Sequence, residues 1–208
     1  MNRVPRPAPR RWALLVLILL FLLALPAPRQ ALERSMTLHM LVQYPLLALC
    51  GILLASALPE RWQAHLARWN AHGIGGLAAV ALILAVLMIP RVLDLALVGW
   101  RVALAKWLAL LVCGAALRLS WQPAAWLVQG FFLGNVLPMT AVAATLYQES
   151  PVRVCNAYLL DDQVRLGQWL ASICAAIALS WFSLLLRSLS LKDGSRGAAS
   201  ASSSPKSH

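Results

Sequence analysis

The sequence predicts an all-α fold, a polytopic bundle of transmembrane helices, and three observations lead to this class. Of the 208 residues, 61% are hydrophobic and only 12% are charged. The mean hydropathy of +0.72 exceeds what a soluble domain of this size could cover with polar surface. Long stretches without Asp, Glu, Lys or Arg recur, and a helix needs about 20 apolar residues to cross the hydrocarbon core. One bundle is expected, without a second domain.

The chain begins with a basic segment and a short apolar run, which together form the predicted unit 1–35. Four arginines precede the run Trp12–Pro26, an arrangement typical of a secretory signal or of a retained signal anchor. Prolines at positions 26 and 28 leave no clean small-x-small cleavage site. We therefore favour a retained anchor that forms the first of six spans. Cleavage would leave five.

Residues 36–191 form the predicted transmembrane bundle. Four of its spans are Met36–Pro59, Trp69–Pro90, Leu119–Gln148 and Gln168–Leu186. Another span starts near Val102, and its uncharged stretch lies between Lys106 and Arg118. In the fifth span, Gly130 and Gly134 form a small-x-x-x-small pair, which allows close helix packing. Residues 192–208 are rich in Ser, Ala and Gly, and we expect a disordered cytoplasmic tail there.

The net charge of +11 is distributed over helix ends and loops. No soluble basic face is predicted on which a duplex could lie, so we exclude nucleic-acid binding. Counting alternate loops from a cytoplasmic N-terminus places 11 of the 18 basic residues inside and seven outside. This bias follows the positive-inside rule. It predicts a multi-pass membrane protein with both termini in the cytoplasm.

A group of side chains suited to metal binding opens the second span. Met36, His39, Met40 and Gln43 are spaced so that all four lie on one face of a helix. The chain has only five methionines and four histidines, so three within five residues is a concentration. Thioether and imidazole groups suit Cu(I). The competing interpretation is an interfacial histidine between two core methionines.

Two other segments bring polar or sulfur groups to the same predicted outer face. Met88 ends the third span and Asp94 lies just beyond it, while Asp161 and Asp162 precede the sixth span. Ionisable groups at such positions are functional candidates. Asp162 could equally cap the N-terminus of the sixth helix.

The cysteines and the remaining polar residues suggest no catalytic machinery. The four cysteines form no Cys-x-x-Cys motif, and Cys50, Cys113 and Cys174 lie within predicted spans as small apolar fillers. Cys155 lies in the last outer loop. The sequence holds no carboxylate pair, nucleophile–base arrangement or phosphate loop. We therefore do not expect an enzyme.

The order of these residues resembles the CtaG-type family of membrane proteins implicated in cytochrome c oxidase assembly. Members commonly open a helix with His-Met-x-x-His, and residues 39–43 read His-Met-Leu-Val-Gln. Their segment His-x-Pro-x-x-x-Asp-x-Ala-Leu is matched by residues 88–97, which begin with Met-Ile-Pro. Their Asp-Gln-x-x-x-Gly stretch is matched by residues 162–167. The three matches occur in the family's order.

The chain also departs from the family pattern. Gln43 stands in place of the second histidine of the first motif, and Met88 in place of the histidine before the proline. The histidines that usually follow Asp-x-Ala-Leu are missing, and Lys106 and Trp107 lie in that region. A Met-Trp pair expected after the glycine is absent. The chain resembles a shortened, histidine-poor member.

The resemblance implies a protein of the bacterial inner membrane that holds Cu(I) at the outer membrane face and helps to mature a haem–copper oxidase. Its partners would be the lipid bilayer and haem–copper oxidase subunits. The candidate ligands are Met36, His39, Met40 and Met88. Gln43, Asp94 and Asp162 would support the ligands or have structural roles.

Two alternatives follow from the residues. A metal-free scaffold would bind an oxidase subunit or another membrane partner through its helix faces, and the missing histidines favour it. A small transporter is disfavoured, because the predicted spans lack paired charges at mid-depth and no inverted repeat is seen.

Overall fold

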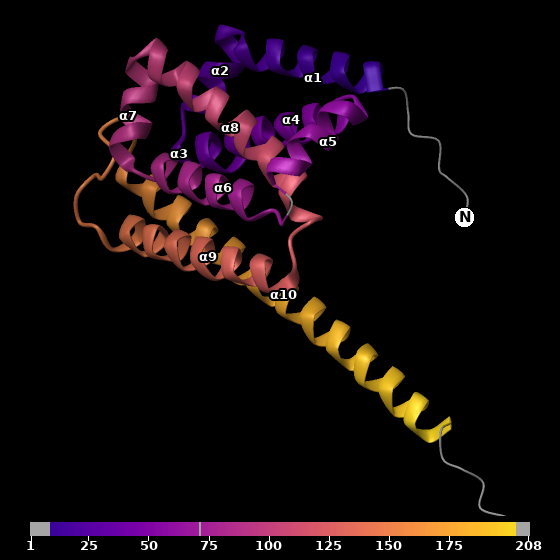
Figure 1. Ribbon diagram of the computed structural model, residues 1–208. Coiled ribbons are helices and arrows are strands. Elements are labelled where there is room, and N and C mark those ends of the chain that lie inside the picture. Colours follow the sequence, from indigo (N-terminus) through magenta and orange to yellow (C-terminus); the bar gives the residue numbers. More distant parts are fainter. Residues whose placement is uncertain (1–8, 71, 203–208) are drawn as a thin grey trace, which may run out of the picture.

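A computed structural model describes residues 9–70 and 72–202, and its regular elements in these residues are all helical (Figure 1). In order they are α1 (Pro9–Ala24), α2 (Pro26–Glu33), α3 (Met36–Leu38), the π-helical turn η1 (His39–Gln43), α4 (Tyr44–Ala57), α5 (Glu60–Trp69), α6 (Ile74–Leu87), α7 (Pro90–Val98), α8 (Trp100–Trp121), α9 (Trp126–Glu149) and α10 (Leu160–Ser202). The predicted all-α class is confirmed.

Four helical segments of the described chain are long and apolar enough to cross a membrane. They are Met36–Ala57, Trp100–Trp121, Trp126–Glu149 and Leu160–Arg187. Two further pairs, α1 with α2 and α6 with α7, pass the same test together, so the number rises to as many as six if each bent pair counts as one span. The protein is therefore a polytopic helical membrane protein.

Sharp bends follow the first and third predicted spans. α1 and α2 meet at 71°, and α6 and α7 meet at 74°. In both cases a proline, Pro26 or Pro90, is the first residue of the second helix. Proline suits this position because it has no N–H to leave unpaired, but it cannot continue a preceding helix. The predicted straight spans Trp12–Pro26 and Trp69–Pro90 are thus the first arms of bent pairs.

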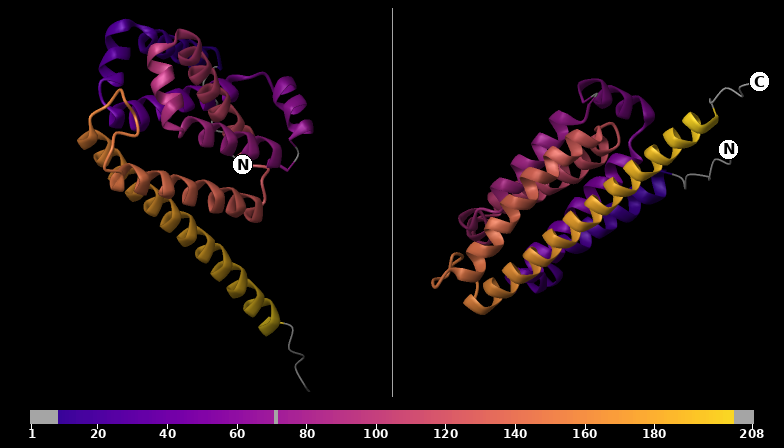
Figure 2. Two further views of the ribbon diagram at one scale, coloured as in Figure 1. Left: turned by 90° about the vertical axis from the view of Figure 1, so that its left-hand side faces the viewer. Right: turned by 90° about the horizontal axis from the view of Figure 1, so that it is seen from below.

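Several segments that are distant in sequence share one end of the bundle, which we call the polar end. It comprises α2, α3, η1, α7, the first turns of α8 and α10, and the loop 150–159 (Figures 1 and 2). Hydrogen bonds join Met36 to Asp162 and Asn156 to Asp94 there. The opposite end holds α5 and the turn between α8 and α9 (Figure 1). The segments expected on the outer side therefore lie together.

The closest helix packing is the crossing of α4 and α8. A Cβ atom on Gly51 would overlap the carbonyl oxygen of Leu111, and one on Gly114 would overlap that of Ala48. Glycine is required at both positions because the two backbones touch. α1 packs along α4 with Val16 and Leu23 buried. α9 and α10 form a hairpin, and in the most apolar 18-residue stretch of each only 11% is buried within the molecule.

The predicted Gly130–Gly134 pair forms only half of a packing contact. Gly130 lies against the indole of Trp181 on α10, whereas a Cβ on Gly134 would meet no atom within 4 Å in the described part of the chain. Sequence spacing alone does not say which side of a helix has a neighbour.

The described part of the predicted tail is helical. α10 continues through Ser202 and so includes residues 192–202. A helix that is already nucleated extends at low cost, and no proline interrupts it before position 205. Residues 203–208, like the arginines at positions 3 and 6, lie outside the described residues.

Gly114→Ala should destabilise the protein because the new methyl group forces α4 and α8 apart. Overpacking of this kind costs about 1–3 kcal/mol. Thermal unfolding in detergent, followed by circular dichroism, measures the loss. Gly134→Ala is the matched control and should be neutral or slightly stabilising, by up to about 1 kcal/mol. Equal melting temperatures for both variants would contradict the backbone contact.

Candidate functional site

The start of the second span is held in place from another helix. Ser35 is the N-cap of α3, and its hydroxyl accepts a hydrogen bond from the Leu38 amide at 3.4 Å. The Asp162 carboxylate on α10 accepts hydrogen bonds from the Ser35 hydroxyl at 2.9 Å, from the Thr37 hydroxyl at 2.8 Å and from the Met36 amide. Asp162 therefore caps α3 rather than its own helix, and it joins α10 to α3.

A π-helical turn then presents the candidate ligands. The amide of Tyr44 donates to the carbonyl of His39, five residues earlier. Pro45 follows, and its ring cannot accommodate the carbonyl four residues before it in a regular α-helix. We attribute the wider turn to this clash. As a result His39, Met40 and Gln43 are all buried, and π turns of this kind are frequent at functional sites.

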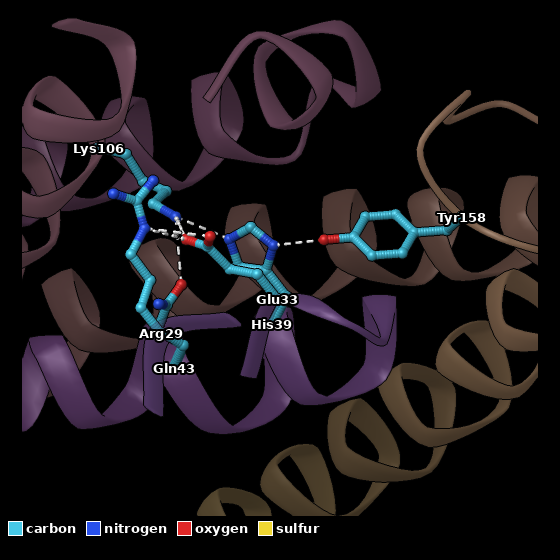
Figure 3. A network of polar contacts seen from close by, with 6 residues as sticks. All are labelled: Arg29, Glu33, His39, Gln43, Lys106 and Tyr158. Atoms are coloured by element: carbon cyan, nitrogen blue, oxygen red, sulfur yellow. Dashed lines mark hydrogen bonds and ion pairs between the residues drawn. The ribbon is translucent and has the colours of Figure 1, made fainter. Parts of the chain in front are cut away.

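The buried ammonium group of Lys106 is the centre of the polar end (Figure 3). Its Nζ lies 2.8 Å from His39 Nε2, 3.1 Å from Gln43 Oε1 and 3.4 Å from Glu33 Oε1. On the far side of the imidazole, His39 Nδ1 lies 2.6 Å from the Tyr158 hydroxyl. α2, η1, α8 and the loop 150–159 thus meet at one chain of polar contacts.

The hydrogen-bonding roles in this chain follow from the donors that each group has. An ammonium group has three donors and no acceptor, and Lys106 has three partners. His39 Nε2 therefore accepts from Lys106, which assigns the neutral tautomer with its proton on Nδ1. The Nδ1–H group donates a hydrogen bond to the Tyr158 hydroxyl. Burial mainly, and also the Glu33 carboxylate, raise the pKa of Tyr158, so its hydroxyl stays protonated.

The charge of Lys106 is balanced from α2. Glu33 also accepts from Arg29 Nε at 3.1 and 3.2 Å, so one carboxylate serves two cations. Lys106 itself is only 2% exposed, and an uncompensated charge at such a position would be very costly.

The position of Lys106 corrects the sequence interpretation. Lys106 was expected to mark the outer border of a span, but α8 begins at Trp100 and encloses it. It lies about 9 Å along the helix at 1.5 Å per residue. Glu33 and Tyr158 were not anticipated as partners. A lone lysine in an apolar run, and a lone glutamate just before a span, were the available signals.

The candidate copper ligands lie in the apolar core of the polar end. Met36 is fully buried and Met40 is nearly so, and both belong to the main hydrophobic cluster. Met88 is half-buried, and its backbone carbonyl accepts from the Tyr147 hydroxyl at 3.2 Å. Within the described residues, no group of three or more His, Cys, Asp or Glu side chains could hold a metal ion. Both ring nitrogens of His39 already have protein partners.

The other candidate carboxylate, Asp94, has a structural position. It accepts from the amides of Asn156 at 3.0 Å and of Ala157 at 3.3 Å. Gln163 holds the same loop, because its Oε1 accepts from the Val154 amide at 2.8 Å and its Nε2 donates to the Tyr147 carbonyl at 3.2 Å. These contacts fix the loop 150–159 so that Tyr158 reaches His39.

Two buried polar atoms beside the network have no partner among the described residues. They are Gln43 Nε2 and the Tyr44 hydroxyl. The Tyr44 ring lies 6.0 Å from Lys106 Nζ and edge-on to the His39 imidazole, with the ring centroids 5.4 Å apart. These two atoms are therefore still able to form hydrogen bonds.

Comparison with protein-family models, with curated proteins and with solved structures finds no match to this chain.

Glu33→Gln should strongly destabilise the protein, because it leaves the Lys106 ammonium buried without a carboxylate. Breaking a buried pair in this way costs about 3–5 kcal/mol. The double variant Glu33→Gln/Lys106→Met should regain more than half of the loss, since the unpaired charge is then gone. Unfolding in detergent, followed by circular dichroism, measures both. Equal losses in the single and double variants would contradict the pairing.

Cys155 should be unreactive toward N-ethylmaleimide at pH 8. Burial, together with the nearby Asp94 carboxylate, raises the pKa of the Cys155 thiol to about 12, so the reactive thiolate is scarce at that pH. Asp94→Asn weakens the anchoring of the loop and should increase the labelling rate, as measured by peptide mass spectrometry. Asp161→Asn changes an exposed carboxylate nearby and serves as the control. Rapid labelling of the unaltered protein would contradict this prediction.

Proposed function

We propose that this protein is a metal-free scaffold of a bacterial inner membrane that binds a membrane partner through its helix faces. One observation carries the proposal: both ring nitrogens of His39 are engaged by Lys106 and Tyr158. A copper ion on Nε2 would have to displace a cation held at 2.8 Å. The network fits a structural role, in which it joins α2, η1, α8 and the loop 150–159.

The surface that is left for a partner is apolar. In the most apolar 18-residue stretch of each of the α9 and α10 spans, only 11% of the residues are buried inside the molecule. Large side chains such as Leu127, Phe131 and Leu179 are 85%, 75% and 71% exposed. Lipid covers such faces by default, and a partner helix can replace it. On the resemblance to CtaG-type proteins, that partner would be a subunit of a haem–copper oxidase.

Cu(I) handling at the polar end is the second candidate. It is favoured by the burial of Met36, His39 and Met40 together, at the π-helical turn of η1. Two thioethers and an imidazole are a donor set that suits Cu(I). In this proposal Lys106 moves away from Nε2 when the metal binds, and Met88 is a further candidate ligand.

Cu(I) stoichiometry on detergent-purified protein distinguishes the two proposals. The scaffold proposal expects no tightly bound copper, either in the unaltered protein or in the Met36/His39/Met40 triple alanine variant. One tight equivalent that is lost in the triple variant would overturn the scaffold proposal and support copper handling. Lys106→Met serves as a further comparison, since removing the ammonium group should strengthen copper binding only if His39 is a ligand.

The same preparations test for a partner. The scaffold proposal expects a membrane protein to co-purify and to remain bound in the Met36→Leu/His39→Ala double variant. Leu127→Ser/Phe131→Ser, which alters an exposed face of α9, should release it.

A further inference from the structure

A groove lies at the end of the bundle opposite the polar network, where α8 ends and α9 begins. It has a volume of about 630 Å³. Ile52 of α4, Leu117 of α8, and Phe132 and Leu133 of α9 form its apolar walls. Arg118 and Trp121 also line it, within the last turn of α8. The groove therefore combines an apolar interior with a cation near the helix end.

The walls of the groove are held in fixed positions. The rings of Trp121 and Phe132 meet edge to face, with centroids 6.3 Å apart. The side-chain amide of Gln129 donates to the carbonyls of Trp121 at 2.9 Å and of Ala124 at 3.1 Å, and so it fixes the turn between α8 and α9. The groove is preformed rather than a product of loose helix ends.

Arg118 retains most of its binding capacity. Its Nε donates to the Ser56 hydroxyl at 3.2 Å. The ion pairs found in the described part of the chain are those of Glu33 with Arg29 and Lys106, and Arg118 belongs to neither. A guanidinium group held only through Nε can still present its two terminal nitrogens to a phosphate.

We propose that this groove binds one anionic phospholipid, with an acyl chain along the apolar walls and the phosphate at Arg118. Arg118 lies one turn from the end of a membrane span, which is the depth of lipid headgroups, and tryptophan is common at that level. Basic pockets between helices are suited to anionic headgroups. α5 adds Arg61 and Arg68 to the same bundle end. The proposal does not depend on the scaffold function.

Native mass spectrometry of the detergent-released protein tests the proposal. Phosphatidylglycerol and phosphatidylcholine with identical acyl chains are added separately. The unaltered protein should retain one phosphatidylglycerol with roughly fivefold preference, the effect expected of one arginine near the membrane surface. Arg118→Gln should abolish the preference. Leu133→Trp, which fills the groove, should remove binding of both lipids.

Matched controls separate the outcomes. Arg61→Gln removes a charge at the same bundle end but outside the groove, and it should keep the preference. A preference that survives in Arg118→Gln, equal binding of the two lipids to the unaltered protein, or undiminished binding in Leu133→Trp would each overturn the proposal. Displacement of the lipid by glycerol phosphate at equal concentration would also overturn it, since the headgroup alone would then suffice. If Arg118→Gln does not fold, the Leu133→Trp and glycerol phosphate experiments still decide.

Discussion

The ammonium group of Lys106 must be neutralised and fully hydrogen-bonded within the bundle, and the polar end is arranged around this constraint. Its three donors are taken by Glu33, His39 and Gln43. The carboxylate comes from α2, which can reach α8 because the chain bends by 71° after α1. His39 faces inward because of the π-helical turn before Pro45. Local irregularities of the backbone thus supply the partners of one buried charge.

The same constraint gives the loop 150–159 a defined position. The Tyr158 hydroxyl accepts a hydrogen bond from the imidazole N–H, and Asp94 and Gln163 bind the loop backbone on either side of Cys155. Asp162 then fastens the start of α10 to α3. His39, Asp94 and Asp162, which suggest a binding site when only the sequence is considered, therefore also make contacts that hold the structure together. The unused polar atoms on Gln43 and Tyr44 lie next to the contacts of His39.

The sequence was sufficient to predict the helical membrane class, and it grouped the right segments at one end. Uncharged stretches report span positions directly, because charges are costly in the hydrocarbon core. The Lys106–Glu33 pair could not be predicted, because it depends on a bend and on helix rotation that apolar periodicity does not encode. The α4–α8 crossing escaped notice for a related reason. Gly51 and Gly114 lie on different helices, and no single-helix motif joins them.

The distances along the chain between the members of the polar network impose an order on its assembly during synthesis. Glu33 and Lys106 are 73 residues apart, whereas His39 and Tyr158 are separated by 119 residues. Lys106 and Tyr158 are 52 residues apart, so at a ribosomal rate of about 5–20 residues per second the lysine emerges roughly 3–10 seconds before the tyrosine. During that interval the lysine can already meet its carboxylate, but the imidazole has no hydroxyl to bind. The charge of Lys106 can therefore be neutralised before Tyr158, the last member of the network, has been synthesised.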